Sequence, residues 1–149
     1  MKNSYQIFGN IFFIAQKWQD IADRDIVARI GITTKQWMLL VILSKVFTNH
    51  LPTIGEAAKA YGTSRQNLKR VAFELQKKGF VIIANDPHDN RIQRIALTGK
   101  DKQYFEGEEN RKWQDEFILK FFKGFNLDEL KNFSDYTKKL LYTIHNLKL

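Results

Sequence analysis

The sequence contains no cysteine, and this absence removes one branch of chemistry. Without a thiol the chain forms no disulfide, no thiolate metal site and no catalytic or redox-sensing cysteine centre. Histidine is scarce as well, and the three residues at positions 50, 88 and 145 show no spacing that places two ligands on one helix face. We therefore expect no metal site and no cofactor.

Long apolar runs are also missing. No segment approaches the roughly 18 consecutive apolar residues that a membrane-spanning helix needs. The amino terminus lacks the basic region, apolar stretch and small-residue cleavage site that are typical of a secretory signal. These two absences predict a cytoplasmic protein that does not enter a membrane.

The residue groupings that carry catalysis are absent too. The sequence shows no Ser-His-Asp grouping, no glycine loop that would cradle phosphates and no carboxylate pair in a plausible pocket. The acidic residues at 106, 108 and 109 are interpreted as a solvated helix face. We expect no catalytic residues and no enzymatic activity; an enzyme that acts on nucleic acid is a rival interpretation that lacks a visible nucleophile.

What the sequence does have is positive charge. It carries 24 lysines and arginines against 16 acidic residues, a net charge of +8 and a pI near 9.7. Between residues 63 and 102, nine basic residues face four acidic ones, so most of the excess lies in about a quarter of the chain. A local excess of this kind favours a polyanionic partner, either nucleic acid or an anionic surface.

Both ends of the chain read as apolar helices. Residues 4–29 carry two neighbouring apolar stripes, and Gly31 is placed to end the helix. So wide an apolar face indicates burial on two sides, either in the core of a monomer or, as we favour, between the domain and a second subunit. A long helix is predicted over residues 98–123, and a last helix capped by Asn126 and Glu129 is predicted to bury Leu127, Leu130, Phe133, Leu140, Ile144 and Leu147.

The middle of the chain predicts three shorter helices. Thr33 and Thr34 open the first, a capping box from Thr53 to Glu56 opens the second, and Gly62 ends that second helix. The third begins in a second capping pattern, Thr63-Ser-Arg-Gln66, and is predicted to bury Leu68, Val71, Ala72 and Leu75.

The second and third of these helices match a helix-turn-helix. The outer face of the third is polar and basic, and Arg, Gln and Asn side chains can bond base edges in a major groove. The alternative is a solvated face in a three-helix domain that binds no DNA. The candidate DNA-binding residues on this face are Ser64, Arg65, Gln66, Asn67, Lys69 and Arg70.

Two β-type runs, residues 80–84 and 92–97, bracket a turn rich in Asp, Pro and Asn. This pattern predicts a hairpin with Arg91 near its tip and Arg94 on its return strand. A charged hairpin is often only a turn in solvent. After a helix pair with a basic face, however, it favours DNA contact, because a helix and a hairpin can hold two grooves of one duplex.

This order of elements resembles the multiple antibiotic resistance regulator (MarR) family of winged-helix transcription factors. The segment from Ile32 to Leu43 resembles the second helix of the family, and residues 62–81 resemble its turn, recognition helix and exit into the wing. The most specific resemblance is the wing pattern of acidic residues, arginines and a closing Leu-Thr: Asp86, Asp89, Arg91, Arg94, Leu97 and Thr98.

The resemblance implies a mainly α fold with a β-hairpin wing that binds double-stranded DNA as a homodimer. Residues 33–99 would form the DNA-binding lobe, residues 1–31 and 101–149 the dimerisation helices, and the whole chain one winged-helix domain. By position, Arg91 would enter the minor groove, Arg94 would support the wing or contact the DNA backbone, and Asp86 and Asp89 would brace the arginines through ion pairs. The protein would be a transcriptional regulator, most simply a repressor of a pseudo-palindromic operator.

The resemblance also implies a small aromatic or lipophilic effector between the dimer helices and the DNA-binding lobe. Candidate residues for such a pocket are Phe12, Trp18, Trp37 and Trp113, although aromatic residues at helical spacing more often belong to a core. Phe73 and Asn90 depart from the family pattern, since the recognition helix has a phenylalanine at a usually polar position and the wing tip only one arginine. A protein-interaction module that docks on an acidic partner is the alternative function.

Overall fold

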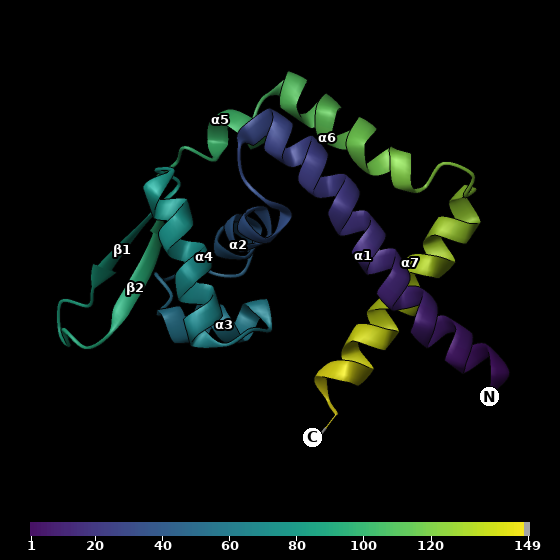
Figure 1. Cartoon of the computed structure of the whole chain (residues 1–149), viewed down its shortest axis with the longest axis horizontal. Helices are drawn as coiled ribbons and strands as arrows, with labels where there is room; N and C mark the ends of the chain where they lie inside the picture. Colours follow the sequence, from purple (N-terminus) through teal and green to yellow (C-terminus); the bar gives the residue numbers. More distant parts are fainter. Residues whose placement is uncertain (148–149) are drawn as a thin grey trace. The chain divides into compact units, whose positions relative to one another are not determined.

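The computed structural model describes residues 1–147, which form helices and one antiparallel hairpin (Figure 1). The elements in chain order are α1 (Lys2–Ile30), α2 (Thr34–Lys45), α3 (Ile54–Tyr61), α4 (Arg65–Lys77), β1 (Val81–Asn85), β2 (Gln93–Leu97), α5 (Lys102–Phe105), α6 (Glu108–Phe121) and α7 (Leu127–His145). The predicted fold class, mainly α with a β-hairpin, is confirmed.

The chain divides into two compact units. The first runs from Met1 to Gly107 and holds α1 to α5 with the hairpin; the second begins at Glu108 and holds α6 and α7. The expected division into a central lobe and two terminal dimerisation segments stays a prediction, and residues 148 and 149 of the last segment lie outside the described part.

Helices α2, α3 and α4 contact one another, and β1 and β2 pack against them. Side chains at helical spacing supply this core: Leu39, Leu40 and Leu43 from α2, Ile54, Ala57 and Ala58 from α3, and Leu68, Ala72 and Leu75 from α4. Val71, which was expected to be buried, is only partly covered, because it lies at the edge of the buried face of α4.

Local hydrogen bonds explain where these helices begin. Thr33 and Thr53 each accept a hydrogen bond from the backbone three residues on, and Gln36 and Glu56 accept one from the backbone of these threonines in return. Both predicted helix starts are thereby confirmed, and Asn126 with Glu129 repeats the arrangement at α7. Gly62 ends α3 with a φ of 77°, a left-handed conformation that suits glycine.

The hairpin pairs along one edge with a short segment that precedes α3. Val81 pairs with Leu97 and Asn85 with Gln93 across the two strands. On the other edge of β2, the amide of Ile95 donates to the Pro52 carbonyl at 3.0 Å, and Thr53 forms an isolated bridge with Arg94. The base of the hairpin is therefore joined to the segment that leads into α3.

The single helix expected over residues 98–123 is wrong. The chain forms α5 and α6 instead, separated by Glu106 in an extended conformation and Gly107 with a φ of 90°. A positive φ cannot continue a right-handed helix, and glycine adopts it without a steric penalty. Residues 106–112 carry no apolar side chain, so the apolar spacing is interrupted at the break, and Gly107 within this polar stretch was its local signal.

The expected burial along α7 is also wrong for the single chain. None of the residues of α7 is buried, and Leu127 is 84% exposed. The other residues that were expected to be buried, and are not, are Leu130, Phe133, Leu140 and Ile144 in α7 and Leu147 after it. The spacing identified an apolar face correctly, but the chain by itself does not cover that face. Helix α1 shows the same pattern, since only Ala22, Ile26 and Ile30 near its end are buried.

Within residues 1–147, no single helix has the length and apolar composition needed to cross a membrane. Helices α1 and α2 meet that composition only as a pair, and the pair is bent by 76° at the break between them.

Candidate nucleic-acid interface

Helix α4 presents a polar face to solvent because its apolar residues lie on the opposite side. Ser64 caps the helix by accepting a hydrogen bond from the Asn67 amide at 3.2 Å. The predicted residues Arg65, Gln66, Asn67, Lys69 and Arg70 are all exposed. In the described part of the chain, no carboxylate forms an ion pair with any cation of this face, so its charge is available to a polyanion.

The turn between β1 and β2 is organised by Asp86, whose residue is only 6% exposed. One carboxylate oxygen accepts hydrogen bonds from the amides of His88 at 2.8 Å and Asp89 at 3.2 Å. The Asp86 amide in turn donates to the Ile92 carbonyl at 2.8 Å. The acidic, proline-containing turn is thus closed by its own first carboxylate.

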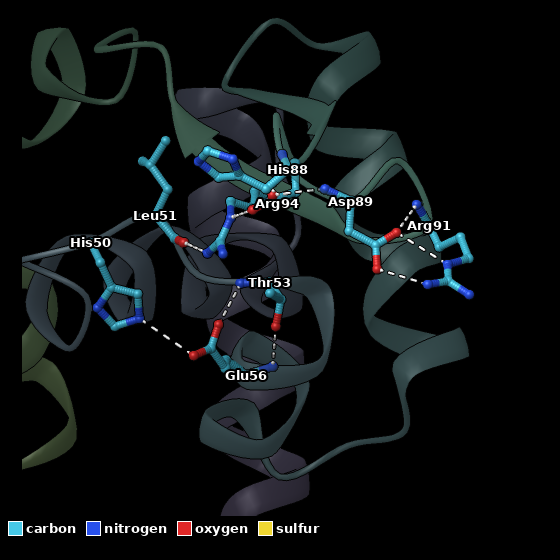
Figure 2. Close-up of polar contacts among 9 residues, drawn as sticks. His50, Leu51, Thr53, Glu56, His88, Asp89, Arg91 and Arg94 are labelled. Carbon is cyan, nitrogen blue, oxygen red and sulfur yellow. Dashed lines mark hydrogen bonds and ion pairs between the residues drawn. The ribbon is translucent and has the colours of Figure 1, made fainter.

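Arg94 connects this turn to the helix-turn-helix. Its Nε donates to the second oxygen of Asp86, and a terminal nitrogen donates to the Leu51 carbonyl at 2.6 Å (Figure 2). The hydrogen bonds of Asp86, with that of Arg94 the largest contribution, hold the pKa of this carboxyl below its ordinary value of 3.8. Arg94 therefore faces the protein, and its position suits support of the wing rather than base contact.

Arg91 lies at the turn and faces solvent, with its side chain 91% exposed. Its guanidinium is paired with Asp89 through contacts of 3.1 and 3.3 Å, which Figure 2 shows at the edge of the wing. The ion pairs expected for Asp86 and Asp89 are present. Their contribution to DNA binding stays a prediction.

A groove runs between the start of α3, the outer face of α4 and the wing. Its volume is about 590 Å³. Three of its lining side chains are cationic, and none is a carboxylate, so the groove is positively charged. The lining residues are Thr53, Ile54, Gly55, Arg65, Gln66, Lys69, Arg91, Ile92 and Gln93.

The four aromatic candidates for an effector pocket do not line this groove. Phe12 and Trp18 lie on α1, where Phe12 is 64% exposed, and Trp37 lies partly buried on α2. Trp113 lies on α6 in the second unit and stacks on Phe117 at a centroid distance of 5.3 Å. An effector pocket formed by these residues stays a prediction.

Two of the nine basic residues between positions 63 and 102, Lys78 and Lys100, make structural contacts. The ammonium of Lys78 donates to the Gly31 carbonyl at 2.7 Å and to Gln36 Oε1 at 3.0 Å. The ammonium of Lys100 donates to the Lys78 carbonyl at 2.7 Å and lies 4.8 Å from the Phe80 ring centroid. All of these contacts join residues that are 20 or more positions apart, so no local pattern could have identified them.

Across residues 1–147, no group of three or more His, Cys, Asp or Glu side chains is arranged to hold a metal ion. His88 lies exposed on the wing turn, and His50 Nε2 lies 3.6 Å from Glu56 Oε1 (Figure 2).

No model of a known protein family matches the sequence. The chain is 26% identical to the transcriptional activatory protein BadR of Rhodopseudomonas palustris over 106 residues, which are 71% of this chain and 60% of BadR. It is 32% identical to the transcriptional repressor MprA of Escherichia coli over 74 residues, which are 50% of this chain and 42% of MprA. The matched regions thus span about half the length of these relatives.

Among solved structures, the chain is similar to Sco3205, a MarR family transcriptional regulator from Streptomyces coelicolor that was crystallised in complex with DNA. The TM-score is 0.77 at 18% identity, over 95% of this chain and 87% of Sco3205. The resemblance found in the sequence is confirmed as a shared fold, that of the winged-helix regulators of the MarR family.

Proposed function

We propose, from the premise that this chain has the fold of the MarR-family regulators, that it is a homodimeric transcriptional regulator that binds double-stranded DNA in a sequence-specific manner. The observation that carries the proposal is the continuous basic surface formed by α4, the groove and the wing. Arg65, Lys69 and Arg91 converge on this surface, and no carboxylate lines it.

The two elements suit two grooves of one duplex. Helix α4 presents Gln66, Asn67 and Arg70 as donors and acceptors for base edges in a major groove. The wing presents Arg91 on a turn that Asp86 and Arg94 stabilise, and this exposed arginine, paired with Asp89 in the free protein, suits the narrower, more negative minor groove. Lysines and arginines near phosphates would supply most of the affinity.

Two exposed apolar faces support a dimer. Along α1, Phe8, Phe12 and Phe13 are exposed in the single chain, and along α7 so are Tyr136, Leu141 and Tyr142. Apolar patches of this extent on a monomer mark interaction sites. Two-fold symmetry would place two copies of α4 about one duplex turn, ~34–36 Å, apart, so the operator would be a pseudo-palindrome.

Repression stays a prediction, because one relative, BadR, is named as an activatory protein and the other, MprA, as a repressor. Release by a small effector is a prediction of the family resemblance alone. The test of DNA regulation against protein docking is competition. A regulator retains its preferred duplex in the presence of excess random DNA, whereas a module for an acidic partner binds all duplexes alike and is displaced equally by any polyanion.

A further inference from the structure

Arg65 lies so close to Gly55 that a side chain at position 55 would meet its guanidinium. A Cβ atom on Gly55 would lie 3.0 Å from Arg65 Nε, 3.2 Å from its Nη2 and 3.3 Å from its Cζ. The guanidinium of Arg65 therefore occupies the space that any other side chain at position 55 would need. The first residue of α4 reaches back against the first turn of α3 instead of projecting straight from its own helix.

This contact fixes where the charge of Arg65 lies. Both residues line the groove between α3, α4 and the wing, and Lys69 and Arg91 line it as well. Within the part of the chain that the structure describes, no carboxylate is paired with Arg65, and the ammonium of Lys69 contacts only the Phe73 ring, at 5.6 Å from its centroid. Arg65 thus adds an uncompensated charge to the groove.

The geometry of a duplex says what would occupy this groove. Adjacent major and minor grooves are separated by one sugar–phosphate strand. If α4 lies in a major groove and Arg91 in the neighbouring minor groove, that strand must pass between the helix and the wing tip. The basic groove with Gly55 in its wall lies in that position.

We propose that Gly55 is a positioning residue that holds Arg65 as a phosphate ligand of the strand between the two grooves, so that Arg65 supplies affinity rather than base preference. The inference rests on the proposed function, and it assigns Arg65, one of the candidate DNA-binding residues, to a phosphate instead of a base edge. Phosphate contacts position a protein on the duplex, whereas contacts with base edges carry its sequence preference.

Gly55→Ala is the sharpest variant. Gly55 does not have a positive φ, and alanine is the better helix former, so the variant keeps its fold while the methyl group forces the guanidinium to move by a few tenths of an ångström. It is compared with Arg65→Ala, with the double variant and with Lys59→Ala, which removes the same charge from an exposed position on α3 outside the groove. Binding is measured on the preferred duplex and on its single-base variants over a range of salt concentrations.

Arg65→Ala is expected to weaken binding to every duplex by roughly tenfold or more, because a charge-assisted hydrogen bond is lost. It should lower the slope of log affinity against log salt concentration by about 0.9 for each protomer bound. Gly55→Ala should act in the same direction and add no further loss when Arg65 is already alanine. Lys59→Ala should leave the affinity for the preferred duplex within about twofold of the original, since exposed charges outside the interface contribute little.

Three results would overturn the inference: unchanged affinity and salt dependence in Gly55→Ala, an equal loss from Gly55→Ala in the Arg65→Ala background, or a loss in Arg65→Ala that is confined to one base pair. Failure of the unmodified protein to bind any duplex would instead contradict the proposed function, and it is seen before any variant is compared. The Nε–Hε NMR signal of Arg65 gives a readout without DNA, because its chemical shift must move in Gly55→Ala if the contact exists in solution.

Discussion

Arg94 and Asp86 form an ion pair that joins the return strand of the wing to its turn, and the carboxylate of this pair is buried. The same guanidinium also reaches the Leu51 carbonyl, so one side chain links the turn, β2 and the segment that leads into α3. Arg94 therefore ties the turn of the wing to the helix-turn-helix, in addition to the Ile95–Pro52 hydrogen bond from β2.

Arg94→Ala should lower both stability and DNA affinity. The substitution leaves the Asp86 carboxylate buried without its cation, which is a costly state. We expect a fall of several degrees in the melting temperature, together with weaker binding to all duplexes alike. Thermal unfolding and binding measured on the same preparation check this, and an unchanged melting temperature would contradict the role given to Arg94.

Arg91→Ala is the matched variant on the same wing. Its ion pair with Asp89 is exposed, and such pairs contribute little, about 0–1 kcal/mol. The melting temperature should therefore stay the same, while affinity falls for every sequence and the slope of log affinity against log salt decreases by about one for each protomer bound. If affinity at moderate salt does not change, the wing does not contact DNA.

Acid should destabilise the wing through Asp86. Its folded-state pKa lies below the ordinary 3.8, so its contribution to stability is present above that pH and is lost as the pH falls through the lower folded value. Asp86→Asn should be less stable at neutral pH and lose less stability on acidification. Thermal unfolding at fixed protein concentration from pH 7 to pH 3 would show this, and parallel curves for the two proteins would refute it.

Lys77 and Lys78 are adjacent in the sequence, but we expect only Lys78 to contribute to the stability of the fold. Lys78 donates to the Gly31 carbonyl and to Gln36, whereas Lys77 forms an exposed pair with Glu74. Lys78→Ala should cost about 1–2 kcal/mol of unfolding free energy, because two hydrogen bonds from a charged donor are lost, one of them to the buried Gln36. Lys77→Ala should cost well under 1 kcal/mol. Equal effects in denaturant unfolding would show that Lys78 is not structural.

The parts of this fold that the sequence predicted are those set by local chemistry. Helix starts at Thr33, Thr53 and Asn126 depend on residues three positions apart, and the buried face of α4 depends on spacing within one helix. The wing could be predicted because its turn residues and its flanking strands are adjacent.

Most of the parts that could not be predicted depend on residues that are distant in the sequence. Lys78 contacts a carbonyl 47 residues away, and the position of Arg65 depends on the missing side chain of Gly55 in the preceding helix. The break at Gly107 differs from these, because it did have a local signal: the glycine lies in a polar stretch, residues 106–112, that the prediction of one continuous helix did not use. The apolar face of α7 was identified from its spacing, but its exposure in the folded chain was not.

The most direct test of the account is selection of bound fragments from random duplex DNA by the full chain. Sequence-specific binding by two copies of α4 and two wings predicts a pseudo-palindromic consensus with half-sites about one duplex turn apart. Asn67→Ala should relax that consensus at particular base pairs, whereas Arg91→Ala should leave it unchanged at lower affinity. Recovery of unrelated fragments with no common sequence would contradict the central claim.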